Sequence, residues 1–188
     1  MTGQQDLQPQ LRRAANHVLQ RLLPSQRESL LIKCWMSHDA RWFMAVAREY
    51  GMQVTNRLNQ VAAHEIGKVE AQRIGRALQL LPVTTLDEYL LAQEVFISLL
   101  GPDLLDYAVT KVRDNAYRTH VRRCFAYENA IHVGIADHFE CGIFARVTGW
   151  LDALGLACEI SPALGKCLKA QGQECTHTIT LREGTVTA

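Results

Sequence analysis

The stretch Tyr107–Arg123, YAVTKVRDNAYRTHVRR, decides the fold class of this sequence. Its polar and apolar residues alternate, and the turn-forming pair Asp114-Asn115 stands at its centre, which is the pattern of a β-hairpin. Two later runs, LACEI at 156–160 and CTHTITLR at 175–182, have the length and β-branched content of strands. We therefore predict an antiparallel sheet in the second half of the chain.

The residues before this hairpin show the three-to-four-residue apolar spacing of amphipathic helices. Prolines and glycines, with Gly51 among them, interrupt that spacing and set the expected helix ends. The predicted helices cover 8–22, 25–50, 53–80, 86–99, 125–133 and 141–154. The order predicts an α+β protein, with an N-terminal helical region followed by an antiparallel sheet with packed helices. We place the two regions at 1–102 and 103–188 and expect them to form one compact domain.

The composition excludes several classes of partner. The 188 residues carry a net charge of +1, so nothing draws the chain as a whole toward nucleic acid or an anionic membrane. No apolar run reaches the roughly 20 residues that span a bilayer, and the first residues lack the apolar core of a secretion signal. We expect a cytoplasmic protein that binds a small-molecule ligand. In that compartment its six cysteines are expected to be free thiols, metal ligands or redox groups.

A histidine and an aspartate lie among aromatic residues in the segment 33–51, KCWMSHDARWFMAVAREYG. On a helix, Trp35, His38 and Trp42 share one face, and Asp39 lies beside that face. Burial there would raise the pKa of the aspartate and lower that of the histidine, so both are active-site candidates. The alternative is a satisfied His-Asp pair that only orients the helix.

The next predicted helix carries a stripe in which polar groups flank small residues. Its members, spaced by three or four, are Asn56, Asn59, Ala63, Gly67, Glu70 and Ile74. Small residues allow a neighbouring helix or a ligand to approach closely. Asn59 and Glu70 therefore either line a ligand site or mark a helix–helix contact. In the second case we expect Glu70 to pair with Arg73 or Arg41.

Five of the six cysteines lie in the last third of the chain, and no Cys-x-x-Cys pair occurs, which argues against a zinc finger. Cys175 and His177 are two apart on a predicted strand, so they share a face and could chelate a metal or form a thiol–imidazole pair. Cys141 stands at the expected start of a helix, where the dipole favours a thiolate, and is the best nucleophile candidate.

Three interpretations of these cysteines stay open: buried structural thiols, a metal site or a catalytic thiol. The metal would be a divalent ion such as zinc, or an iron–sulfur centre would take its place. The candidate ligands are Cys141, Cys158, Cys167, Cys175 and His177.

Several blocks of the sequence together resemble a known group of proteins. They are the block Trp35–Gly51 with its HD-x-RWF core, the run LNQVAAHEIGKVEAQRI at 58–74, Cys124, and GIADHFECG at 134–142. In this combination the chain resembles an uncharacterised cytosolic family related to the L-2-amino-thiazoline-4-carboxylic acid hydrolase-like proteins, over roughly residues 30–180. The resemblance implies an α+β protein, and an activity that opens a cyclic carbon–nitrogen bond of a small molecule.

On that hypothesis the candidate catalytic residues take distinct roles. Asp39 or Glu70 would be a general base, with His38 as its acid–base partner. Cys141 would be a nucleophile or ligand, and Asn59 would orient the substrate or stabilise negative charge. A second hypothesis is a non-catalytic metal- or small-ligand-binding module that uses the C-terminal cysteines. A third is an interaction protein whose aromatic and small-residue faces pack in a homodimer.

Overall fold

The computed structural model describes residues 7–80 and 82–182 of the chain, which divides into two units, Met1–Arg41 and Trp42–Ala188. In the first unit, helix α1 (Gln8–Leu19) confirms the helix predicted at 8–22 and ends slightly earlier. Helix α2 (Pro24–Ala77) then begins and continues into the second unit. None of the described residues of the first unit is buried.

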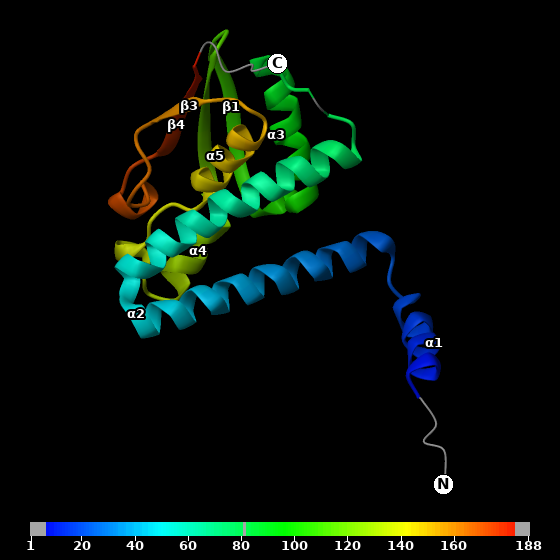
Figure 1. Cartoon of the computed structure of the whole chain (residues 1–188). Coiled ribbons are helices and arrows are strands. Elements are labelled where there is room, and N and C mark those ends of the chain that lie inside the picture. Colours follow the sequence, from blue (N-terminus) through cyan, green and yellow to red (C-terminus); the bar gives the residue numbers. More distant parts are fainter. Residues whose placement is uncertain (1–6, 81, 183–188) are drawn as a thin grey trace. The chain divides into compact units, whose positions relative to one another are not determined.

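Helix α2 consists of two helical limbs, 24–50 and 52–77, which meet at Gly51. The backbone there has φ 75° and ψ 165°, a conformation that glycine adopts at little cost. The break confirms the helix end predicted at Gly51 (Figure 1). Every buried residue of α2 lies in the second limb, from Thr55 onward.

The remaining elements also follow the predicted order. Helix α3 (Leu86–Leu100) begins with a capping box, in which the hydroxyl of Thr85 accepts from the Glu88 N–H and the Glu88 carboxylate accepts from the Thr85 N–H. After it come η1 (Pro102–Leu104), β1 (Leu105–Arg113), β2 (Ala116–Cys124), α4 (Phe125–His132), η2 (Ala136–His138), α5 (Ile143–Ala153), β3 (Cys158–Ser161), η3 (Lys169–Gln171) and β4 (Cys175–Leu181).

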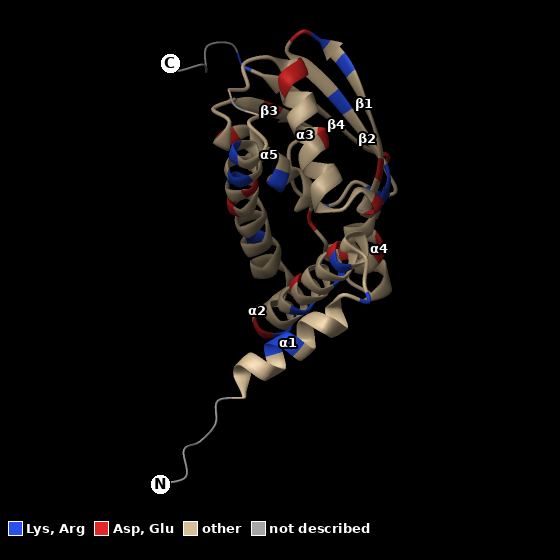
Figure 2. Ribbon diagram, turned by 90° about the vertical axis from the view of Figure 1, so that its right-hand side faces the viewer, with Lys and Arg blue, Asp and Glu red and all other residues tan. Residues whose placement is uncertain are grey.

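The four strands form one antiparallel sheet in the order β1-β2-β4-β3, which confirms the α+β class. Strand β4 buries every second residue, as expected for a sheet with one covered face. Residues of α3, α5 and the second limb of α2 pack with that face in one core. Figure 1 shows α3 and α5 beside the strands, and Figure 2 shows residues of both charges on the β1–β2 hairpin.

The core of the second unit draws on residues from both sides of position 102. Tyr89 of α3 and Tyr117 of β2 are fully buried, and both hydroxyls donate to the Gln93 side-chain oxygen, at 3.0 and 2.8 Å. The region boundary expected at 102 therefore falls inside one core. Within the described residues, no helix is long and apolar enough to cross a membrane.

Candidate functional site

Four cysteines from four separate segments lie near one another, Cys124, Cys141 and Cys175 at the core under the sheet and Cys167 in a second, smaller apolar cluster. Cys175 begins β4, where it pairs with Val121 of β2 and faces the core. Cys124 ends β2 and packs against the same core because β2 carries a β-bulge, with Arg122 as the extra residue. Without that bulge, strict alternation from Val121 would turn Cys124 to the opposite face.

Cys141 and Cys167 are placed by a short antiparallel pairing of two loop segments. The Cys141 N–H donates to Gly165 O and the Cys167 N–H donates to Phe139 O, both at 2.9 Å, on either side of a bridge between residues 140 and 166. Alternate side chains of an extended segment point to opposite sides. Cys141 and Cys167 therefore share one side of this pairing, and residues 140 and 166 lie on the other.

The electrostatic effects of the thiols on one another indicate that the four lie in one neighbourhood. The pKa of Cys141 is raised to about 11, mainly by burial and in smaller part by the nearby Cys124 and Cys167. Burial likewise raises the pKa of Cys175 to about 12, with contributions from the other three thiols. Burial, and then Cys167, raise the pKa of Cys124. Each of the four thiols thus interacts with the other three.

The prediction that the start of the helix lowers the pKa of Cys141 is wrong. The peptide N–H groups of Phe144 and Ile143, in the first turn of α5, do act to lower it. Burial has the larger effect, because a thiolate loses its hydration in an apolar surrounding. Cys141 as it stands is therefore a protonated thiol at neutral pH.

Two of the predicted metal ligands lie away from this group. Cys158 pairs with Leu181 at the far end of β4, six residues and about 20 Å along the strand from Cys175. His177 shares the core face of Cys175, as predicted, but its ring packs on Phe144 with centroids 4.1 Å apart. Among the described residues, no group of three or more His, Cys, Asp or Glu side chains is arranged to hold a metal ion.

His177 makes stability depend on pH. Burial lowers its pKa from 6.5, against the opposing effect of the Pro162 carbonyl, which accepts from Nδ1–H at 3.2 Å. Above pH 6.5 the ring is neutral in both folded and unfolded chains. Below it, the unfolded chain takes up a proton that the folded chain resists, so stability falls until the folded pKa is reached.

We expect the free energy of unfolding, measured in urea, to drop between pH 7.5 and pH 5.5, with a slope of at most about 1.4 kcal/mol per pH unit from this group. His177→Gln should flatten that slope, whereas substitution of the exposed His132 should not. An unchanged slope in His177→Gln contradicts the assignment.

Glu70 is held in a buried ion pair, not in a pocket. Its carboxylate is bound by the guanidinium of Arg146 through two hydrogen bonds, with Nε at 2.7 Å, and by the indole N–H of Trp150 at 3.1 Å. The partner proposed from sequence, Arg73 or Arg41, is therefore replaced by Arg146. The part of this stripe that holds Gly67 and Glu70 makes a helix–helix contact, and the partner helix is α5.

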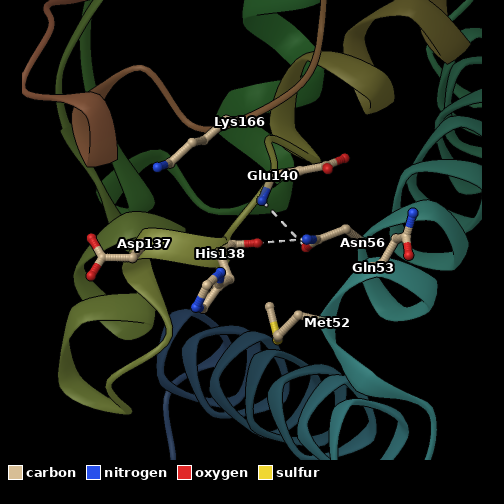
Figure 3. A pocket seen from close by; sticks show the side chains of 7 residues that line it. All are labelled: Met52, Gln53, Asn56, Asp137, His138, Glu140 and Lys166. Atoms are coloured by element: carbon tan, nitrogen blue, oxygen red, sulfur yellow. Dashed lines mark hydrogen bonds between the residues drawn. The ribbon is translucent and has the colours of Figure 1, made fainter.

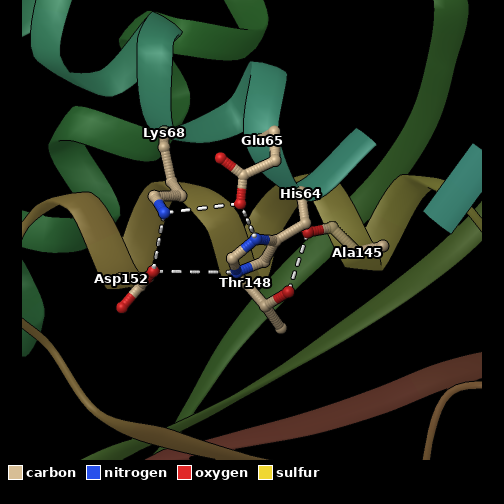
Figure 4. A network of polar contacts seen from close by, with 6 residues as sticks. All are labelled: His64, Glu65, Lys68, Ala145, Thr148 and Asp152. Carbon is tan, nitrogen blue, oxygen red and sulfur yellow. Dashed lines mark hydrogen bonds and ion pairs between the residues drawn. The ribbon is translucent and has the colours of Figure 1, made fainter. Parts of the chain in front are cut away.

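Two glycines allow the second limb of α2 and helix α5 to approach closely. A Cβ on Gly67 would lie 2.3 Å from the Arg146 carbonyl oxygen, and one on Gly149 would lie 2.1 Å from the His64 carbonyl oxygen. A surface network of His64, Glu65, Lys68 and Asp152 spans the same two helices, with Lys68 Nζ 3.4 Å from Glu65 and 3.7 Å from Asp152 (Figure 4). Such exposed pairs contribute little stability.

The other predicted catalytic residues are only partly brought together. Asn59 lies beside Gly142, next to Cys141, because a Cβ on that glycine would be 2.6 Å from the Asn59 amide nitrogen. His38 and Asp39 belong to the first unit, and both are exposed. The expected burial of His38 and Asp39 among aromatic rings is therefore wrong. Burial was the reason for choosing the two residues as active-site candidates, and that reason no longer holds.

A polar pocket of about 260 Å³ lies on the other side of the pairing that carries Cys141 and Cys167 (Figure 3). Buried Asn56 anchors its wall by donating to His138 O at 2.6 Å and accepting from the Glu140 N–H at 3.3 Å. The lining residues are Met52, Gln53, Asn56, Asp137, His138, Glu140 and Lys166. The sequence patterns do not predict this pocket, although the GIADHFECG block contains three of its residues.

The fold and this site define an α+β protein with a group of four neighbouring thiols beside a small polar pocket. A family model described as a family of unknown function (DUF6125) matches residues 27–137, more than half of the chain. The chain belongs to this family. No curated protein matches it. The matched region includes Cys124 and ends before the other three thiols of the group.

Proposed function

We propose that this chain is a metal-binding module whose ligands for a thiophilic divalent ion such as zinc are Cys124, Cys141, Cys167 and Cys175. The observation that supports it is that these four thiols, from β2, β4 and the paired loop segments, lie near enough to raise one another's pKa. Four cysteines are a common ligand set for structural zinc, with Zn–S bonds of about 2.3 Å. Such a closed site leaves no open coordination position, so the module is non-catalytic.

The surroundings of two of the thiols suit thiolates that are bound to a cation. Cys124 is the N-cap residue of α4, and Cys141 lies just before α5. Peptide N–H groups of both helices favour the thiolate forms. Burial alone keeps these thiols protonated, whereas a bound dication removes the protons and offsets the charge of the sulfurs.

Binding requires a local change of side-chain torsions. No three described donors stand at ligand positions now, so the four side chains must turn toward a common centre. Rotation about one Cα–Cβ bond moves a sulfur by a few ångström without moving the backbone. The hydrolase activity stays a prediction: it would need Asn59 and Cys141 together with an acid or base other than the ion-paired Glu70.

The test is the metal content of the full chain purified without added metal, followed by reconstitution with zinc after removal of bound metal by a chelator. We expect about one zinc ion per chain, and loss of that ion in Cys141→Ser and Cys167→Ser. The matched control is Cys158→Ser, which changes a partly buried cysteine of β3 outside the group of four and should retain the metal. Absence of zinc from the reconstituted wild-type chain, or equal loss in the control, overturns the proposal.

A further inference from the structure

The polar pocket beside the loop pairing takes no part in the proposed metal module. All of its lining residues belong to the second unit: some come from η2 and the two paired loop segments, the others from the start of the second limb of α2. Its volume of about 260 Å³ lies below the range of sites for drug-sized ligands, so it fits a small molecule. The wall is preorganised, because buried Asn56 ties the backbone of residues 138 and 140 to α2.

Glu140 and Lys166 lie directly opposite each other in the loop pairing. The backbone hydrogen bonds of Cys141 and Cys167 flank them on both sides, which makes them a non-hydrogen-bonded pair, the kind whose side chains lie closest. The Cβ atoms of such a pair are about 4.5–5.5 Å apart, and opposite charges there attract each other. An ion pair between Glu140 and Lys166 is therefore expected.

The two side chains do not form that ion pair. Glu140 Oε2 accepts instead from the Gln60 side-chain N–H at 3.2 Å. Lys166 Nζ makes no ion pair or hydrogen bond with any residue that the structure describes. Figure 3 shows the two side chains extending in opposite directions from the pairing. The pocket thus has a carboxylate turned to one side and an ammonium group turned to the other.

The charges around the pocket disfavour a ligand of a single sign. Asp137 adds a second carboxylate to the lining. A simple anion would lie near two carboxylates, and a simple cation would lie near the Lys166 ammonium group. A molecule with one charge of each sign avoids both repulsions if its charges are far enough apart. Met52 adds an apolar side chain to the lining, which suits a hydrocarbon spacer between the charges.

We propose that this pocket binds a short linear molecule with an ammonium group at one end and a carboxylate at the other. The ammonium group pairs with Glu140 and the carboxylate pairs with Lys166. A spacer is needed because these two side chains extend in opposite directions. The inference goes beyond the metal module and does not rest on it, because Glu140 and Lys166 lie on the side of the pairing opposite to Cys141 and Cys167.

The test is a nuclear magnetic resonance titration of the isotope-labelled full chain with γ-aminobutyrate, followed at the backbone amide signals of the lining residues. We expect saturable shifts of these signals. Two probes of similar length are the controls: putrescine has an ammonium group at both ends, and succinate has a carboxylate at both ends. Each should bind at least about tenfold more weakly than γ-aminobutyrate, because one of its ends meets a like charge.

Two variants test which residue binds which end. Glu140→Gln keeps an acceptor for Gln60, and Lys166→Met changes an exposed side chain, so both should fold. Each should raise the dissociation constant for γ-aminobutyrate at least about tenfold. The matched control is Lys169→Met, since this lysine donates to Arg122 O outside the pocket, and it should bind as the wild type does. Metal content should not change in these variants, which distinguishes a failure here from a failure of the metal module.

Three outcomes overturn the proposal. The first is a wild-type chain whose pocket signals do not shift with γ-aminobutyrate at millimolar concentrations. The second is binding of putrescine, succinate or glycine as tight as that of γ-aminobutyrate, which would assign the pocket to a single charge or to a compact amino acid. The third is an equal loss of binding in Lys169→Met, which would place the bound molecule outside the pocket.

Discussion

Glu70→Ala is expected to lower the free energy of unfolding by about 3–5 kcal/mol, because it removes the carboxylate that two hydrogen bonds join to the largely buried Arg146 guanidinium. The Glu70 and Arg146 side chains are only 8% and 19% exposed, so the lost interaction lies at a site with little contact with solvent. Trp150 also loses the acceptor of its indole N–H. The measurement is urea unfolding followed by tryptophan fluorescence and circular dichroism.

The double variant Glu70→Met/Arg146→Met is the matched control, since replacing both partners by apolar residues of similar length should recover much of the loss. This recovery of stability is expected if the ion pair between Glu70 and Arg146 has only a structural role. If Glu70→Ala is as stable as the wild type and the chain loses only a ligand response, the carboxylate serves a site, as the catalytic hypothesis supposed.

Gly149→Ala is expected to destabilise the chain by about 3 kcal/mol or more, because the added methyl group meets backbone, which cannot turn aside as a flexible side chain can. The His64 carbonyl carbon as well as its oxygen would lie within 3 Å of the new Cβ. Gly67→Ala should act similarly, from the other helix of the same crossing. Thermal unfolding gives the comparison.

Gly165→Ala is the control for this prediction, because nothing lies within 4 Å of a Cβ built at that position. It should change the melting temperature little. A Gly149→Ala chain with wild-type stability would show that α2 and α5 can separate at their crossing without cost.

The fold was predictable because its local signals are strong. Gly51 breaks α2 where expected, Thr85 and Glu88 cap α3, and Asp114-Asn115 turns the hairpin. Each signal depends on a few neighbouring residues. The strand order was not predictable, since the pairing of β4 between β2 and β3 joins residues far apart in sequence.

The candidate site was predicted only in part, because it too depends on how segments far apart in sequence pair. Cys141, Cys167 and Cys175 were named from sequence, and the structure brings them together. Cys124 was missed because its side depends on the bulge at Arg122, which alternation counted from the hairpin turn does not reveal. Cys158 was included wrongly, because the register of β3 on β4 places it at the far end of the strand.

Because β2 carries a bulge, the effect of an insertion or deletion in the hairpin depends on where it is made. Two residues added at the tip, beside Asp114, would extend the loop and leave every inward side chain inward. Removal of Arg122 alone would take out the bulge and leave Cys124 two residues after Val121, on the same inward side of the strand. A one-residue deletion elsewhere in β2 would instead shift the register and turn the side chains beyond it to the other face of the sheet.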